Sequence, residues 1–389
     1  MRNRLQYVAR DERGMSLVFV SVGLMAMLSA TTLAIDVGMF MNARSQAQNS
    51  ADAGALAGAV ALAYNSNTDR SPTGPAVQSA INTGKTNLVA AGAVSIEPSD
   101  VTFPLDPAGR PNRVAVQVFR TVGRNNSVPT LMGGFFGVNR VDITASATAE
   151  ASAANAETCV KPFTIPDRWT EKQTGPWDPD DTFDLYASKN KPLANPDVYV
   201  PLKPYPDPNT DYTGYNADRD RGLQIVLKAG NDTKVSSSFY NPWALPGRGG
   251  ADDYREDIAT CNTTVIPIGS LMNAEPGNMV GPTSQGTHDL VERDPRARWD
   301  GSCKCVKDSA FRISPRVIII PLYDPVYYET GKQNGSNAAL KIANYLGFFI
   351  EEQTGNEVTG RITPVGGVFA GNAGPAPIGA FPVVIRLVQ

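Results

Sequence analysis

The chain has 389 residues, of which 42% are hydrophobic and 19% are charged, with 35 basic and 38 acidic side chains. It is too long for one ordinary domain and apolar enough to bury cores, so general disorder is not expected. The net charge is −3, so the chain lacks the excess of basic residues that is typical of nucleic-acid-binding proteins. It has one histidine, which argues against chemistry that uses paired histidines.

The first predicted element is a membrane helix. The sequence from Met15 to Ile35 carries no charged residue, and about 20 apolar residues are enough to span a bilayer core. A cleaved signal peptide is the alternative, but its apolar core should be shorter and should end at a small-residue cleavage site. Here the pattern continues past Asp36 without a turn residue, which favours a retained helix.

The charges that flank this span predict its orientation. Four arginines precede the span, and the first charged residue after it is Asp36. The arginines are Arg2, Arg4, Arg10 and Arg13. The positive-inside rule then places residues 1–14 in the cytoplasm and the bulk of the chain in the periplasm or outside the cell. We therefore expect a single-pass protein of the inner membrane.

The same helix is expected to continue to about Ala63, so that residues 15–63 form the transmembrane helix and its exported extension. No proline interrupts residues 36–63, and small residues recur four apart, which places them on one face. Small side chains let another backbone approach closely, although alanine also favours helix by itself. The predicted packing residues are Ala47, Ala51, Gly54, Ala55, Gly58 and Ala59. The partner of this face stays open between the protein's own globular part, another copy and other membrane proteins.

The stretch from Arg10 to Leu62 resembles the N-terminal domain of the TadG-like family, components of the tight-adherence (Tad/Flp) pilus machinery. The matching elements, in chain order, are Arg13-Gly14 before the span, Ala34-Ile35-Asp36-Val37-Gly38 at its end, Arg44, Gln48, and Ala51-Asp52-Ala53-Gly54-Ala55-Leu56-Ala57-Gly58-Ala59. The resemblance implies a single-pass, pseudopilin-like envelope protein linked to pilus assembly, adhesion or secretion. It does not explain the remaining chain.

Two departures from this family's pattern limit what the resemblance implies. Larger TadG-like proteins carry an Asp-x-Ser-x-Ser metal motif that this sequence lacks, so no metal-dependent adhesion site of that kind is expected. Prepilins carry a glutamate five residues after the cleaved glycine, and Phe19 stands at that position here. Peptidase processing after Gly14 is therefore not expected.

Residues 65–155 are predicted to form a small α+β domain, which begins with a polar linker at residues 65–74. Apolar residues at helical spacing predict a helix over Pro75–Ala91, and a short helix is expected at Pro129–Phe136. Alternating apolar residues predict the strands Val94–Phe103, Arg113–Val122 and Val141–Ala151.

Residues 156–389 are predicted to form a β-rich exported domain with long surface loops, because prolines cluster there with aromatic residues. Strands are expected at Leu223–Leu227, Arg316–Leu322 and Tyr345–Ile350, and Phe381–Val388 is expected to be an edge or closing strand. The predicted fold class is therefore α+β: a long N-terminal transmembrane helix, a small pseudopilin-like α+β domain, and a β-rich, loop-heavy domain.

All four cysteines lie in this last region, which favours disulfides in an exported protein. They are Cys159, Cys261, Cys303 and Cys305. A Cys303–Cys305 bridge would close a very small ring, so we expect each of these two to bond to Cys159 or Cys261. Zinc is not favoured, because one intervening residue is too few for the usual spacing and no histidine is near.

No pattern in the chain indicates catalysis. His288 precedes Asp289, but no Gly-x-Ser-x-Gly turn supplies a nucleophile, so this histidine is expected in an exposed loop. Glu329, Glu351 and Glu352 are expected to be solvated surface charges. Alternating Asp and Asn residues are weak calcium candidates that lack the glycine and glutamate of an EF-hand loop. These candidates are Asp207, Asn209, Asp211, Asn216, Asp218 and Asp220. No metal and no cofactor are expected.

We therefore expect a non-enzymatic, single-pass envelope protein of a Tad/Flp-type pilus or tight-adherence system that acts through protein–protein contacts in assembly or adhesion. Its expected partners are other pilus-assembly or pilin-like proteins and the membrane, without nucleic acid, and a homo-oligomer stays open. Two alternatives also stay open. One is a structural minor pilin incorporated in the fibre, and the other is a membrane-anchored enzyme that acts on envelope substrates.

Overall fold

The computed structural model describes residues 13–65, 69–107, 109–203, 211–230, 234–333, 339–371 and 382–388. Several predicted features lie outside these residues: most of the cytoplasmic segment 1–14 with Arg2, Arg4 and Arg10, part of the linker at 65–74, and the calcium candidates Asp207 and Asn209. By its internal contacts the chain divides into two compact units, Met1–Glu150 with Ile385–Gln389, and Ala151–Val384. We call them the first and second unit.

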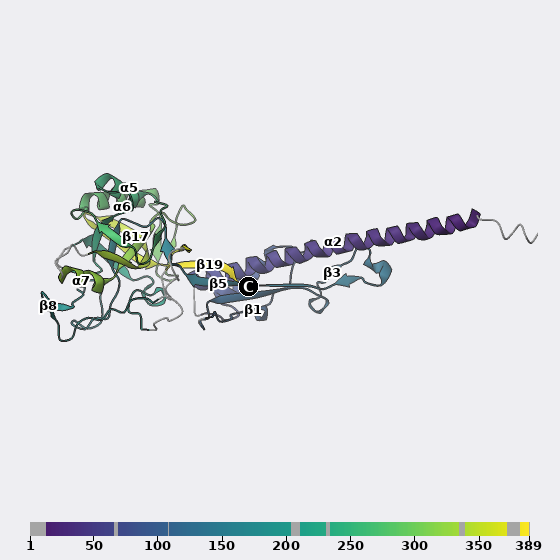
Figure 1. The fold of residues 1–389 in the computed structure, drawn as a ribbon, viewed down its shortest axis with the longest axis horizontal. Helices are drawn as coiled ribbons and strands as arrows, with labels where there is room; N and C mark the ends of the chain where they lie inside the picture. The colour runs from purple at the N-terminus through teal and green to yellow at the C-terminus, as the bar shows by residue number, and fades with distance from the viewer. Residues whose placement is uncertain are drawn as a thin grey trace, which may run out of the picture. The chain divides into compact units, whose positions relative to one another are not determined.

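The first unit is organised around one long helix, α2 (Arg13–Tyr64), which has 52 residues. The helix ends one residue beyond the predicted limit at about Ala63. It contains no proline and is rich in alanine, the residue with the highest helix propensity, so no position in the sequence ends it early. Its apolar N-terminal part is exposed and is long and apolar enough to cross a membrane (Figure 1).

A second helix and a sheet pack against the C-terminal half of α2. Within the described residues the sheet has four strands in the order β1-β2-β5-β19, and β1–β2 and β2–β5 are antiparallel. The elements are α3 (Pro75–Thr86), β1 (Val101–Thr102), β2 (Arg113–Arg120), β5 (Ile143–Ala153) and β19 (Val383–Val388). A small hairpin joins β2 to β5. It consists of β3 (Val128–Pro129), a 3-10 helix (Gly133–Phe136) and β4 (Arg140–Val141).

Several predicted elements of this unit are shorter than expected. The helix that begins at Pro75 ends at Thr86, because Ala90 and Ala91 form a turn with positive φ angles of 46° and 59°. The strand expected at Val94–Phe103 is reduced to β1, because a 3-10 helix occupies Pro98–Asp100. The helix expected at Pro129–Phe136 is only the 3-10 turn that starts at Gly133.

The last strand of the chain pairs with a different sheet from the one that the sequence predicts. The sequence predicts Phe381–Val388 as an edge or closing strand of the β-rich domain. Val383–Val388 is a strand, but it pairs with β5, and its residues from Ile385 onward belong to the first unit. The reason is a long-range pairing that the local alternation of residues does not encode.

The second unit is a β-rich region with a closed β-barrel. Its described strands follow the order β10-β18-β17-β13-β11-β7-β16, and the additional pairings β10–β11 and β17–β16 close the sheet. The strands are β7 (Phe163–Pro166), β10 (Gln224–Ala229), β11 (Phe239–Ala244), β13 (Leu271–Ala274), β16 (Val317–Tyr323), β17 (Leu340–Thr354) and β18 (Glu357–Thr363). The longest, β17, contains the predicted strand Tyr345–Ile350 and has buried residues on both faces along this stretch.

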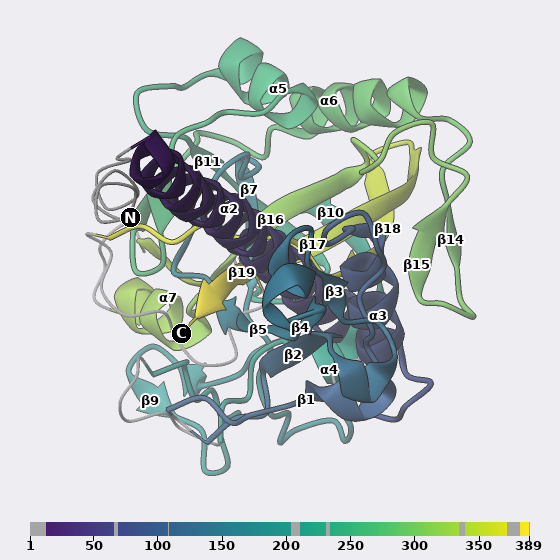
Figure 2. The ribbon, with the colours of Figure 1, turned by 90° about the vertical axis from the view of Figure 1, so that its right-hand side faces the viewer.

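Helices and short hairpins complete the second unit. Helix α5 packs against α6, and α6 in turn contacts β17 and β18 (Figure 2). The helices are α4 (Ala217–Asp220), α5 (Ala251–Ala259), α6 (Val280–Arg293) and α7 (Pro325–Gln333). The short strands form three antiparallel pairs: β6 (Ala156–Glu157) with β12 (Ile266–Pro267), β8 (Tyr186–Ser188) with β9 (Lys191–Pro192), and β14 (Arg298–Asp300) with β15 (Cys305–Lys307).

Both disulfides lie in the second unit, and the expected pairing is wrong. Cys159 bonds to Cys261, and Cys303 bonds to Cys305. The β14–β15 hairpin turns back at residues 301–304, with Lys304 at a positive φ of 49°, and this brings the two close cysteines to a Cα–Cα distance of 5.2 Å. That distance lies within the usual range for a disulfide, so the small ring is not an obstacle.

Candidate functional site

The predicted packing residues of α2 face the interior of the first unit. Ala47, Ala51, Ala55 and Ala59 are each no more than 1% exposed, and they belong to one core cluster with residues of α3 and β2. An added Cβ at Gly58 would lie 2.7 Å from Val114 Cγ1, which shows how closely the strand approaches the helix. Of the three partners left open for this face, the protein's own domain is the one that the structure contains.

Polar groups add specificity to the same contact. The buried Ser50 hydroxyl donates a 2.7 Å hydrogen bond to the Gly84 carbonyl oxygen, which ties α2 to α3. On α2, a Cβ at Gly54 would lie 3.0 Å from the Ala80 carbonyl oxygen. Small residues are therefore required because backbone atoms of α3 occupy the space that larger side chains would fill.

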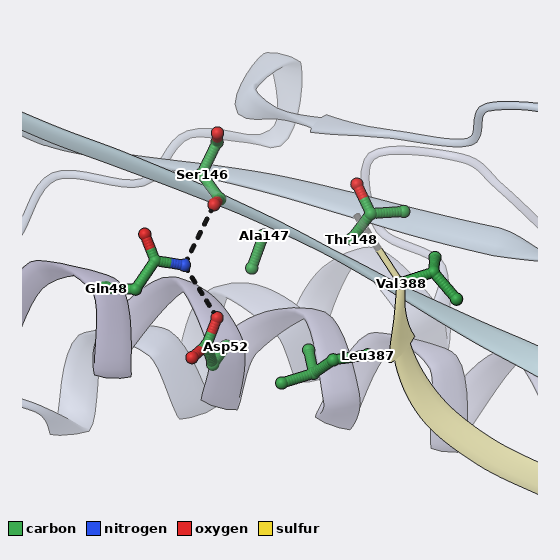
Figure 3. A pocket seen from close by; sticks show the side chains of 7 residues that line it. All are labelled: Gln48, Asp52, Ser146, Ala147, Thr148, Leu387 and Val388. Carbon is green, nitrogen blue, oxygen red and sulfur yellow. Dashed lines mark hydrogen bonds between the residues drawn. The ribbon is translucent and has the colours of Figure 1, made fainter.

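The flank of α2 beside this buried face lines an open groove (Figure 3). Its volume is about 660 Å³. Its lining residues come from α2, β5 and β19: Gln48, Asp52, Ser146, Ala147, Thr148, Leu387 and Val388. A smaller hollow of about 320 Å³ continues along β5 and is lined by Arg44, Gln48 and Thr144 among others.

Gln48 connects the helix to the strand across this groove. Its amide Nε2 donates to the Ser146 carbonyl oxygen at 3.1 Å and to Asp52 Oδ1 at 2.8 Å (Figure 3). Strand β19 pairs with β5 and ends beside the groove at Val388. At Ser146, on the edge of β5 away from β2, a side chain of α2 donates to the carbonyl oxygen of the strand. Backbone groups along such an edge are suited to pairing with another chain.

A second contact of α2 lies at the end of its apolar span. Asp36 is only 5% exposed. Its carboxylate accepts hydrogen bonds from the backbone N–H of Leu131 at 2.9 Å and of Met132 at 3.1 Å. Both donors belong to the β3–β4 hairpin. The sequence resemblance marked Asp36, but nothing in the sequence indicated its partner.

The described calcium candidates do not form a cation site of the expected kind. The Asp220 carboxylate pairs with the guanidinium groups of Arg168 and Arg219, and it accepts the backbone N–H of Asn216 at 2.8 Å. Two positive charges thus occupy the place that a cation would take. Among the described residues, no group of three or more His, Cys, Asp or Glu side chains is arranged to hold a metal ion.

The groups considered for catalysis come from different elements, and three of them have charged partners close by. His288 is on α6 rather than in a loop, and its Nε2 lies 3.1 Å from Glu292 Oε1, one helical turn away. Glu351 pairs with Arg361 at 2.9 Å, and Glu329 pairs with Lys332 at 2.8 Å. The Glu329 and Glu351 side chains are only 13% and 22% exposed, so they are partly buried ion pairs and not the solvated surface charges that the sequence predicts.

Sequence reasoning missed three buried ionisable groups of the second unit. Burial raises the pKa of Glu157 to about 8 and lowers the pKa of Lys161 to about 7, where the nearby Asp257 partly opposes the shift. Burial also raises the pKa of Asp167 to about 6, although hydrogen bonds from the Tyr215 N–H and from the Tyr212 and Tyr199 hydroxyls oppose it. No local sequence signal distinguishes these residues from exposed ones.

Together, the exposed apolar helix and the domain packed on its far half fit a membrane-anchored protein. Residues 14–61 match the protein family described as "Putative Flp pilus-assembly TadE/G-like". This match confirms the resemblance of the N-terminal segment and supports involvement in a Tad pilus system, in a structural or assembly role rather than catalysis. Comparisons with curated proteins and with solved structures gave no match.

Proposed function

We propose that the protein is a single-pass envelope protein of a Tad/Flp-type pilus or tight-adherence system that acts through protein–protein contacts in assembly or adhesion. The observation that carries this proposal is the groove beside α2. The family segment builds the helical side of this groove, and two of its matched positions, Gln48 and Asp52, point into the groove instead of into the core.

The contact that fits this groove best is the addition of a strand from a partner. An extended segment could continue the sheet along β5 where β19 ends, because main-chain hydrogen bonds supply affinity in this recognition mode. Gln48 would exchange its bond to the Ser146 carbonyl for a bond to the incoming backbone. The chemistry of the partner is therefore an extended segment of another pilus-assembly or pilin-like protein, or of a second copy of this chain.

The proposed topology has the N-terminus in the cytoplasm, the apolar N-terminal part of α2 in the inner membrane, and the rest of both units in the periplasm or outside the cell. Arg13 before the span and Asp36 after it support this direction under the positive-inside rule. The two disulfides support an oxidising compartment for the second unit. The proposed parts are residues 1–14, 15–63, 65–155 and 156–389.

Site-specific photo-crosslinking in cells that express the full pilus system tests the groove. The probe replaces Thr144, which is exposed and lines the hollow along β5. The matched control replaces Thr102, an exposed threonine on β1 at the opposite edge of the same sheet. We expect crosslinks to another protein from position 144 and none from position 102. Equal crosslinking at both positions, or none at 144, would reject the groove as the contact surface.

A second candidate function is a minor pilin within the fibre, and one observation favours it. An exposed apolar helix whose far half packs on a small sheet is an arrangement that could also polymerise through the helix. Fractionation separates the two functions. The envelope protein is expected with membranes after shearing, whereas a fibre subunit would be recovered in the sheared pili.

A further inference from the structure

The β3–β4 hairpin stands at the point where the apolar span of α2 ends. The Leu131 and Met132 backbone N–H groups bond to the Asp36 carboxylate, and the 3-10 helix Gly133–Phe136 contacts α2 (Figure 1). Asp36 directly follows the uncharged run that ends at Ile35. The hairpin therefore lies at the level at which α2 would leave the hydrocarbon core of a bilayer.

Internal hydrogen bonds give this hairpin a defined shape. Val128 pairs with Val141, and the Thr130 hydroxyl donates to the Val138 carbonyl oxygen at 2.7 Å. The Val138 N–H donates to the Gly133 carbonyl oxygen at 3.0 Å, and Gly137 closes the turn with a positive φ of 78°. A positive φ of this size favours glycine over other residues. The tip therefore has a defined backbone conformation.

Three large apolar side chains of this tip are exposed, beside the polar Asn139. Leu131 is 65% exposed, Phe136 58% and Val138 49%. Beside them on α2, Ile35 is 46% exposed and Leu33 62%. Single exposed apolar residues are ordinary on protein surfaces, but a group at the end of a membrane span indicates an apolar partner.

We propose that the tip of the β3–β4 hairpin inserts Leu131, Phe136 and Val138 into the boundary between headgroups and acyl chains, in the leaflet through which α2 leaves the membrane. The occupant of this apolar surface is lipid, because the hairpin is bonded to α2 at Asp36, directly after the apolar span and next to the exposed Ile35. The hairpin also carries an exposed basic residue, Arg140, at its base, where lipid phosphates would lie. This inference rests on the membrane anchoring that is part of the proposed function.

The two hydrogen bonds to Asp36 have two roles at the end of the span. A carboxylate at the edge of the hydrocarbon core is costly unless donors compensate it. The two backbone N–H groups supply that compensation and at the same time hold the hairpin against α2. A span with a second contact of this kind has a fixed rotation about its axis, because only one side of α2 carries the hairpin.

An environment-sensitive fluorophore on single cysteines tests the insertion in the full chain. The four native cysteines are paired in disulfides, so an introduced cysteine is labelled selectively. The probe goes on Phe136→Cys, and the matched control is Leu105→Cys, which is also 58% exposed but lies in the loop after β1. Met25→Cys, in the span, reports the anchor itself. Each protein is reconstituted at high dilution in phosphatidylcholine–phosphatidylglycerol vesicles.

We expect blue-shifted emission and at least twofold stronger quenching by headgroup-region nitroxide lipids at position 136 than at position 105. Equal emission and quenching at 136 and 105, with position 25 quenched by deep nitroxides, would overturn the insertion and leave the anchor standing. If the fluorophore at position 25 were not quenched by deep nitroxides, both the membrane anchoring of α2 and the insertion of the hairpin would be overturned. A blue shift at 136 that depends on protein density and is insensitive to nitroxide lipids would assign the tip to a second copy and also overturn the proposal.

Discussion

The two units of this protein are built from different kinds of core. The first unit packs α2 and α3 against one sheet with alanine and valine, such as Ala51, Ala80 and Val116, all fully buried. The second unit packs large side chains in two separate clusters, with Phe348 in one and Trp243 and Tyr345 in the other. The first core depends on how closely backbones approach, and the second depends on how much volume is filled.

Both units bury polar groups. The second unit buries Glu157 and Lys161 almost completely, and the first unit buries Asp36 and Ser50 of α2. All four tryptophans, at positions 169, 177, 243 and 299, lie in the second unit, so tryptophan fluorescence follows the unfolding of that unit alone. We therefore expect the two units to unfold separately and to respond to different perturbations.

The largest expected effect is the loss of the Cys159–Cys261 disulfide in the second unit. This bond joins residues 102 apart, and a closed loop of about that length stabilises by about 5 kcal/mol in the chain-entropy treatment. The double variant Cys159→Ser/Cys261→Ser should lower the free energy of unfolding by an amount of this order, measured by urea titration with tryptophan fluorescence.

The second disulfide is the matched control for that experiment. Cys303 and Cys305 are two positions apart, so their bond restricts the unfolded chain very little. Cys303→Ser/Cys305→Ser should lower the free energy of unfolding by only about 1.5 kcal/mol in the same treatment. Equal losses for both double variants would show that chain closure is not the source of the stability.

The next effect is a pH dependence of the second unit with opposite signs for two groups. The pKa of Glu157 is raised from 4.5 to about 8, so the folded state binds the proton more tightly and stability falls as pH rises from about 4.5 to about 8. The pKa of Lys161 is lowered from 10.5 to about 7, so stability rises as pH rises from about 7 to about 10.5. Each contribution is on the order of 5 kcal/mol, at about 1.4 kcal/mol per pKa unit.

Two variants separate these contributions in urea titrations at a series of pH values. Glu157→Gln should flatten the fall between about pH 4.5 and 8, and Lys161→Met should flatten the rise between about pH 7 and 10.5. The first unit should not respond to either substitution. A Glu157→Gln profile that keeps the slope of the unmodified protein in the acid range would contradict the assignment.

The smallest of the three effects concerns the close packing of the first unit. Leucine at Gly58 would clash with Val114 Cγ1 and with Ala80 Cβ, which would lie 2.7 Å and 3.2 Å from the new Cβ. Overpacking should outweigh the gain in helix propensity, for a net loss of about 2 kcal/mol. Limited proteolysis of the detergent-solubilised full chain should show faster cleavage in β2 and α3.

Gly38→Leu is the control on the same helix, because no atom lies within 4 Å of the position that a Cβ would take at this glycine. This variant should be cleaved no faster than the unmodified protein. If Gly58→Leu and Gly38→Leu behaved alike, the small residues of α2 would reflect only the composition of the helix, and the comparison between the two cores would lose its basis.

Much of the first unit could be read from the sequence because its signals are local. The uncharged run from Met15 and the absence of proline up to Tyr64 predicted one long helix, and the alternation in Val141–Ala151 predicted β5 within two residues at each end. The small residues of α2 predicted a packing face from their spacing along the helix, and Ala47, Ala51 and Ala55 are buried in the core of the first unit.

Only the tertiary structure decided which partners those elements meet. The pairing of β19 with β5, the closure of the barrel, the Cys303–Cys305 bond and the contact between Asp36 and the hairpin all join segments whose encounter no local pattern specifies. The burial of Glu157 and Lys161 is of the same kind. Helix spacing is set by neighbours three and four residues away, whereas strand pairing and burial depend on the balance of loop closure and packing over the whole chain.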